Sequence, residues 1–152
     1  MAFTCRTSDQ VSACPTPIPG SVEDTTLQNA RSQAAFPLKY PCFLPLSEKL
    51  SDSSATGDAG RQQIELVWTG PFNMSIRQSQ FAPAVSPDPT GASREELQLF
   101  SNVSAALITE DNGTGHTMYH LFWQQGDIYY EIQANGPPLQ RDTILKIARS
   151  LQ

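Results

Sequence analysis

Apolar and polar side chains alternate in two neighbouring stretches of the chain, and this alternation predicts a pair of β-strands. Residues 61–69 place Ile64, Leu66 and Trp68 at every second position. The alternation continues through residues 71–81, after a Thr-Gly-Pro sequence that joins the two runs. Because successive side chains of a strand point to opposite faces of a sheet, we expect a hairpin of two half-buried strands.

A second hairpin is predicted over residues 116–134, where Gly126 can supply the positive φ of a tight turn. Alternate positions of its first strand place large apolar side chains on one face, namely Tyr119, Leu121 and Trp123. The other face carries His120 and Phe122. A strand with two largely apolar faces is expected inside the sheet and beneath a helix.

Helical spacing marks both ends of the folded part. Near the C-terminus, apolar residues recur at i, i+3, i+4 and i+7, namely Ile144, Ile147, Ala148 and Leu151. This pattern predicts a helix docked on the sheet. Towards the N-terminus, Ser21 is a suitable N-cap and Leu27 belongs to a weak apolar face made largely of alanines. We expect a short helix there, at the margin of the fold.

The most apolar stretch, residues 36–50, is interrupted by Pro37, Pro41 and Pro45. Each proline lacks a backbone donor and pushes the residue before it towards an extended conformation. The stretch is therefore neither a helix nor a central strand, and we expect an edge strand or an extended segment pinned to the core by its side chains. Residues 51–60 are polar and predict a loop.

Together these elements predict an α+β fold. Its twisted, mainly antiparallel sheet has about five strands and is covered on one face by the C-terminal helix, with the short N-terminal helix at the margin. Residues 95–110 fit either two short strands or a turn of helix followed by one strand. The chain of 152 residues suits a single domain, which we place at residues 21–152. Residues 1–20 include the sequence CPTPIPG and are expected to form a flexible, Pro-rich tether.

Composition limits the possible partners. The net charge is −5, and binding to nucleic acid requires clustered Lys and Arg, so we expect no nucleic-acid partner. No apolar run reaches the roughly 18–20 residues of a transmembrane helix. A polar surface built from Ser, Thr, Gln and Pro favours an extracytoplasmic location, at the cell surface or secreted, with an export or anchor segment before residue 1 in the native gene.

The chain contains three cysteines, Cys5, Cys14 and Cys42. Cys5 and Cys14 bracket a short loop that a disulfide could close, which would leave Cys42 as the free thiol. The alternative is three unpaired thiols, with Cys42 acting as a small buried hydrophobe. The spacing of the cysteines is not that of a zinc site.

The residues that could carry chemistry do not form a catalytic or metal-binding pattern. His116 and His120 would lie roughly 13 Å apart on a strand, too far to share a metal ion. Cys42 lies in an apolar setting that disfavours the reactive thiolate. The adjacent carboxylates at 95–96 and at 110–111 point to opposite faces of a strand. We therefore expect no enzyme, no metal and no cofactor.

Four aromatic residues are candidates for binding a ligand, Trp68, Tyr119, Trp123 and Tyr129. They could line a groove for a lipid or a peptide. The alternative is that they pack in the core, as large aromatic side chains usually do.

Three segments of the chain, residues 27–45, 64–70 and 119–152, resemble a family of uncharacterised bacterial extracytoplasmic domains. These domains occur in lipoproteins and C-terminal to membrane-anchored anti-sigma-like proteins. The matching residues at the proline-rich segment are Phe36, Pro37, Pro41, Leu44 and Pro45. Those near the C-terminus are Trp123, Tyr130, Leu139, Ile147, Ala148, Ser150 and Leu151.

The resemblance covers residues 26–152, and this chain departs from the family pattern in having Gln140 at the usual helix cap and Cys42 in place of Ser or Thr. The matching motifs are scaffold residues. The resemblance therefore implies the fold and export from the cytoplasm, and it brings no catalytic residues with it.

Three hypotheses for function follow. The first is a non-enzymatic extracytoplasmic module, tethered at its N-terminus in its native context, that binds a protein or a component of the cell envelope. The second is a carrier or sensor of a hydrophobic small molecule held between sheet and helix, which requires an aromatic-lined cavity of at least about 300 Å³. The third is a hydrolase, which requires His116 or His120 within hydrogen-bonding reach of a nucleophile.

Overall fold

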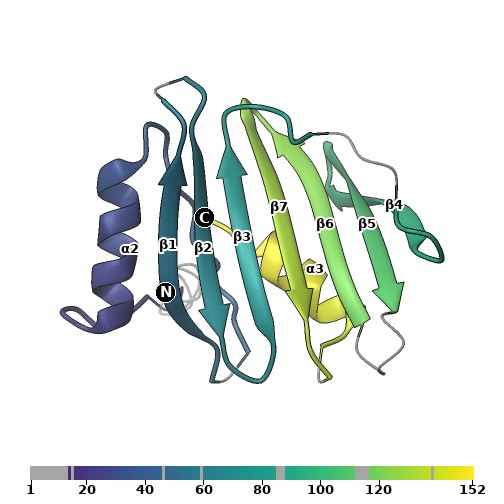
Figure 1. The fold of residues 1–152 in the computed structure, drawn as a ribbon, viewed down its shortest axis with the longest axis horizontal. Coiled ribbons are helices and arrows are strands. Elements are labelled where there is room, and N and C mark those ends of the chain that lie inside the picture. The colour runs from purple at the N-terminus through teal and green to yellow at the C-terminus, as the bar shows by residue number, and fades with distance from the viewer. Residues whose placement is uncertain are drawn as a thin grey trace, which may run out of the picture.

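The computed structural model describes residues 14, 16–45, 47–58, 60–84, 88–111, 117–137 and 139–152 (Figure 1). Two helices lie in the described part of the chain, α2 (Val22–Gln33) and α3 (Arg141–Arg149). The strands are β1 (Lys49–Thr56), β2 (Gln63–Thr69), β3 (Asn73–Ser79), β4 (Ser93–Phe100), β5 (Val103–Asp111), β6 (Thr117–Gln125) and β7 (Ile128–Asn135). Neither described helix is long and apolar enough to cross a membrane.

The strands form one antiparallel sheet in the order β1-β2-β3-β7-β6-β5-β4. The two predicted hairpins are confirmed as β2–β3 and β6–β7, and the turn of the second contains Gly126 at φ 63°. Pairing of β3 with β7 joins the two halves of the sheet, from segments distant in sequence. The α+β fold and the antiparallel sheet are confirmed, and residues 95–110 contain strands on both sides of a turn.

The expected count of about five strands is wrong, because the described residues form a sheet of seven. Strand β1 occupies much of the stretch that the sequence predicts to be a polar loop. Of its eight residues only Leu50 is buried, so the strand has no alternating apolar pattern. Pairing with β2 and contact with α2 stabilise it instead: Leu50 donates its backbone N–H to Oε2 of Glu23 on α2, at 3.0 Å.

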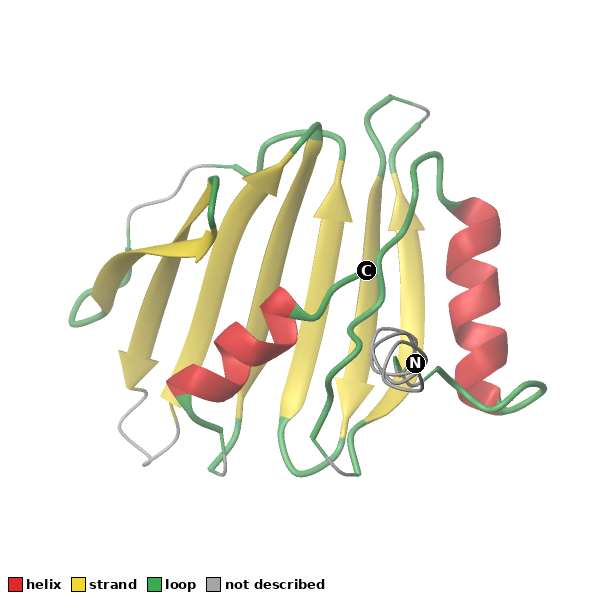
Figure 2. Cartoon of the chain, turned by 180° about the vertical axis from the view of Figure 1, so that it is seen from behind, coloured by secondary structure: helices red, strands yellow, loops and turns green. Residues whose placement is uncertain are grey.

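Helix α2 lies beside β1 at the edge of the sheet, as expected for a marginal helix (Figures 1 and 2). It begins after Ser21, whose hydroxyl accepts a hydrogen bond from the backbone N–H of Asp24 at 3.1 Å. Leu27 and Ala30 are its buried residues. The small apolar face predicted for this helix is thus sufficient to cover an edge strand.

Helix α3 packs on one face of the sheet, which we call the covered face (Figure 2). The predicted apolar stripe is confirmed, since Ile144, Ile147 and Ala148 are fully buried. Leu151 lies just beyond the helix and is also buried, in an isolated antiparallel bridge with Pro41. Burying one such aliphatic side chain contributes about 1.5–3 kcal/mol, an upper estimate because unfolded chains are partly compact.

The proline-containing segment crosses the covered face beside α3 as an extended chain (Figure 2). We call residues 34–45 the strap. Its backbone is held at Tyr40, which exchanges two hydrogen bonds with Gln152, at 2.9 and 3.1 Å. Of the two predicted alternatives, the extended segment is therefore confirmed, and backbone pairing with the C-terminus fixes it in addition to side-chain packing.

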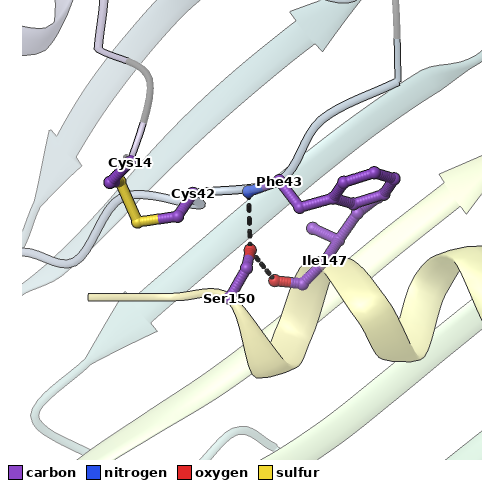
Figure 3. The surroundings of a disulfide bond; sticks show 5 residues. All are labelled: Cys14, Cys42, Phe43, Ile147 and Ser150. Carbon is purple, nitrogen blue, oxygen red and sulfur yellow. Dashed lines mark hydrogen bonds between the residues drawn. A yellow bond between two sulfur atoms is a disulfide. The ribbon is translucent and has the colours of Figure 1, made fainter. Parts of the chain in front are cut away.

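A disulfide joins Cys14 to Cys42 of the strap, with the two Cα atoms 4.6 Å apart (Figure 3). The predicted pairing of Cys14 with Cys5 is therefore wrong, and so is the prediction of a free Cys42; Cys5 itself lies outside the described residues. Short spacing favoured the local loop, but the chain forms α2 and then returns along the strap to the neighbourhood of Cys14. Tertiary structure brings together two cysteines that are 28 residues apart.

Candidate functional site

The face of the sheet opposite α3 and the strap is not crossed by any described helix or loop (Figure 1). We call it the open face. In its centre, the register of five adjacent strands places on this side Glu65 and Val67, Ser75 and Arg77, Glu131 and Gln133, His120 and Phe122, and Ala106 and Ile108. These are the positions between the buried core residues of each strand, so the alternation that builds the core also builds this surface.

Three charged residues from three strands lie side by side across the open face. Arg77 donates from Nε to Oε2 of Glu65 at 3.0 Å and from Nη1 to Oε1 of Glu131 at 3.3 Å. Strand pairing sets this contact, because Glu65, Arg77 and Glu131 are opposite one another in β2, β3 and β7. Opposite charges in such cross-strand positions stabilise a sheet.

His120 extends this row towards β5. Its Nε2 lies 2.9 Å from Oε2 of Glu110, and its Nδ1 lies 3.9 Å from Oε2 of Glu131. The nearby carboxylate of Glu131 raises the pKa of His120, and Glu110 adds to the rise against the desolvation that burial imposes. The imidazole also stacks on the ring of Phe122, with centroids 6.3 Å apart. Glu65, Arg77, Glu131, His120 and Glu110 together form what we call the charge network.

The geometry of the network does not suit metal binding or nucleophilic catalysis. Glu110 and Glu131 approach opposite nitrogens of the His120 ring, so their oxygens do not converge on one point. Within the described residues, no group of three or more His, Cys, Asp or Glu side chains could hold a metal ion. Both nitrogens of His120 face carboxylates rather than a hydroxyl or thiol. His116 lies outside the described residues.

A shallow hollow of about 170 Å³ adjoins the network on the open face. It is lined by Asn73, Ser75, Gln133 and Asn135, together with the apolar residues Val67, Met74 and Ala134. Gln133 is opposite His120 in the β6–β7 pairing, so the hollow and the network are neighbours. Pockets for small molecules usually measure about 300–1,000 Å³, so this hollow fits a side chain or part of a ligand.

The structure separates the four aromatic residues that the sequence offered as ligand candidates. Trp68, Tyr119 and Trp123 are buried in the core on the covered face. Trp68 contacts Tyr40 of the strap, with ring centroids 5.9 Å apart, and Trp123 stacks on Tyr130 at 5.1 Å. Tyr129 lies on the open face, where it helps to line a hollow of about 20 Å³.

The charge network was not predicted, because its members are spread over five strands. His120 was interpreted as an ordinary strand histidine and Glu110 as half of a diverging acidic pair. The available signal was that ionisable residues occupy the open-face positions of β2, β3, β6 and β7. Only the strand order shows that these positions are neighbours.

No protein-family model matches the chain, and neither a curated protein nor a solved structure matches it. The resemblance to extracytoplasmic bacterial domains thus stays a prediction, and functional inference depends on the geometry of the chain itself.

Proposed function

We propose that the protein is a non-enzymatic extracytoplasmic binding module that holds a protein partner on the open face of its sheet. The observation that carries this proposal is the asymmetry of the sheet. One face is sealed by α3 and the strap, whereas the other presents an ordered charge network and a hollow. A rigid surface with positioned polar groups favours recognition, because little freedom is lost when a partner binds.

The disulfide supports the extracytoplasmic part of the proposal. Cys14 and Cys42 are joined within the folded body, and disulfides persist mainly in oxidising compartments. The sequence resemblance points in the same direction, since the family occurs in lipoproteins and membrane-anchored proteins. In the native context, the chain before Cys14 would then connect the module to its anchor.

The packing favours a binding surface over an internal carrier. A carrier for a hydrophobic molecule would need aromatic side chains exposed to a cavity between sheet and helix. Trp68 is instead fully buried and Trp123 nearly so, each against another aromatic ring. The open face is therefore the better candidate for contact with a partner.

Site-specific photo-crosslinking in the cells that make the protein tests this function. A photoreactive residue at Asn73, which is exposed on the open face, should give a discrete crosslinked partner. The same residue at Asn29, exposed on α2, is the matched control and should not give that partner. A crosslink pattern identical at both positions, or no crosslink at Asn73, would contradict the proposal.

A further inference from the structure

We propose that the partner presents a basic, extended protein segment, and that Glu65, Glu110 and Glu131 of the open face receive its cationic side chains. This inference rests on the proposed binding function and specifies the chemistry of the partner. Its support comes from charge, from the location of the lysines and from the apolar residues beside the network.

The charge network is acidic. It contains three carboxylates, one guanidinium and one imidazole, so two negative charges remain uncompensated while His120 is neutral. The network hydrogen bonds use a single oxygen, Oε2, of Glu65 and of Glu110. Their side chains are 25% and 30% exposed, so both carboxylates are accessible to a partner. Partial burial strengthens an ionic contact relative to one in bulk water.

The lysines of the chain do not compensate this charge, because each is engaged elsewhere. The chain has only three. Lys39 lies over the ring of Tyr130 and Lys146 over the ring of Phe43, at 5.5 and 4.2 Å from the centroids. Lys49 is 4.0 Å from Glu23 of α2. No lysine therefore compensates the network, and a partner can supply the complementary cation.

Apolar side chains adjoin the network and suit a peptide better than a small cation. Val67 and Phe122 are partly exposed on this face, whereas Ala106 and Ile108 of β5 are buried beside Phe122. The ring of Phe122 can receive a guanidinium or ammonium group in addition to His120. Glu65 and Phe122 are opposite ends of a row that crosses β2, β3, β7 and β6. Three strand spacings make this row about 14 Å long, which about four residues of extended chain would span. The hollow beside the row, which Val67, Ser75 and Gln133 help to line, extends the surface that a peptide would contact.

The same charges disfavour other occupants. A second copy of this chain, docked through its own open face, would bring one acidic network against another. Nucleic acid and anionic lipid would meet the same repulsion. A metal ion would lack converging ligands, as the geometry around His120 shows.

The test is a titration of the oxidised protein with a short synthetic peptide in which Arg and Leu alternate, followed by backbone amide NMR. The reference peptide has Glu in place of each Arg. We expect shift changes concentrated on β2, β3, β5, β6 and β7, with binding that weakens as salt is raised. The Glu-containing peptide should cause no such changes.

Two variants and a control make the assignment specific. Glu65→Gln and Glu110→Gln remove accessible charges while Glu131, which links Arg77 to His120, stays in place. Together they should weaken peptide binding about fivefold to tenfold, the range expected for two partly exposed ion pairs. Asp142→Asn is the control, since this carboxylate is 89% exposed on α3 and should leave the affinity unchanged.

Each remaining outcome overturns the inference. The inference is wrong if the shift changes map away from the open face or if the Arg-containing peptide does not bind. It is also wrong if Asp142→Asn loses as much affinity as the two glutamate variants. Failure of the basic-segment inference can be distinguished from failure of the proposed binding function. A partner captured through Asn73 that does not compete with the peptide would leave the binding function intact and remove only the basic segment.

Discussion

The side-chain amide of Gln78 makes two hydrogen bonds with the backbone of Lys39. Its Oε1 accepts from the Lys39 N–H at 2.9 Å, and its Nε2 donates to the Lys39 carbonyl at 2.8 Å. Gln78 lies on the covered face of β3 and has no exposed surface, whereas Lys39 belongs to the strap. A polar residue in the core thus fixes the strap by satisfying both backbone polar groups of one residue. A buried amide is stable only when it is paired in this way.

Replacing Gln78 by Leu should destabilise the protein by about 1–3 kcal/mol, because the N–H and C=O of Lys39 would lose their partners. Urea unfolding measures the loss, and hydrogen exchange at the Lys39 amide should accelerate in parallel. Gln124→Leu is the control, since Gln124 is exposed on β6 and should change stability by less than about 0.5 kcal/mol. Unchanged stability of Gln78→Leu would show that the strap does not depend on this contact.

Peptide mapping of the oxidised protein should identify the cysteine pair. Trypsin separates the three cysteines into residues 1–6, 7–31 and 40–49. A bond between Cys14 and Cys42 links the second peptide to the third and releases the first as a monomer. Mass spectrometry without reduction reads this directly. A link between residues 1–6 and 7–31 would instead support the Cys5–Cys14 pairing and contradict the structure.

Loss of the disulfide should cost about 3–4 kcal/mol, since the bond closes a long loop that contains α2. Cys42→Ser and Cys14→Ser should lower the thermal midpoint by similar amounts. Cys5→Ser should leave it unchanged, which makes this variant the matched control. If the two former variants were as stable as the parent under oxidising conditions, the bond would have no structural role.

The pKa of His120 predicts a pH dependence of stability. The groups that face the imidazole are Glu131 on β7, which also binds Arg77, and Glu110 and Ile108 on β5. Because these carboxylates raise the pKa in the folded state, the protonated form stabilises the protein fully below the ordinary value of 6.5. This contribution is lost as the pH rises through the raised pKa.

Thermal unfolding between slightly acidic and slightly alkaline pH measures this loss. The His120→Gln variant should lack the decline that the parent shows above its ordinary pKa. The chain has two histidines, so comparison of parent and variant NMR spectra assigns the imidazole signals of His120. A midpoint at or below 6.5 for these signals would contradict the ion-paired geometry.

Glu48 predicts a second pH dependence, because this carboxyl is only 7% exposed. Its Oε2 accepts from the backbone N–H of Phe72 at 3.2 Å, whereas Oε1 is buried with no hydrogen-bond partner in the described structure. Burial raises the pKa of Glu48, opposed by the Phe72 hydrogen bond. Since the folded state favours the protonated carboxyl, stability should fall as the pH rises from 4.5 through the raised pKa.

Glu48→Gln should therefore raise the thermal midpoint at neutral pH, because a neutral amide can still accept from Phe72 without burying a charge. The gain should disappear at acidic pH, where the parent carboxyl is protonated. Glu96→Gln, an exposed carboxylate on β4, should show no such pattern. A variant that is less stable than the parent at neutral pH would indicate that the ionised form is needed.

The elements that the sequence predicted correctly are those with a strong local pattern. Apolar residues alternate around Trp68 and Trp123, and this pattern correctly predicts which side of each strand is buried. The helical spacing from Ile144 to Ala148 does the same for α3. Ser21 and Gly126 mark a helix start and a hairpin turn, because their conformational preferences act within a few residues. Such features depend on neighbouring residues alone.

The features that the sequence did not predict depend on residues far apart in the chain. Strand β1 carries almost no apolar pattern and forms because β2 and α2 satisfy its backbone and bury Leu50. Cys14 meets Cys42 only after the strap has crossed the sheet.

The sequence by itself determined the class of fold, most of the strands and the two helices. The reason is that the spacing of apolar residues along consecutive positions indicates which side of a strand or helix is buried. The tertiary structure alone decided the strand order, the disulfide and the charge network of Glu65, Arg77, Glu131, His120 and Glu110. The reason is that pairing of strands distant in sequence, such as β3 with β7, fixes which side chains become neighbours, and no local pattern encodes that partnership.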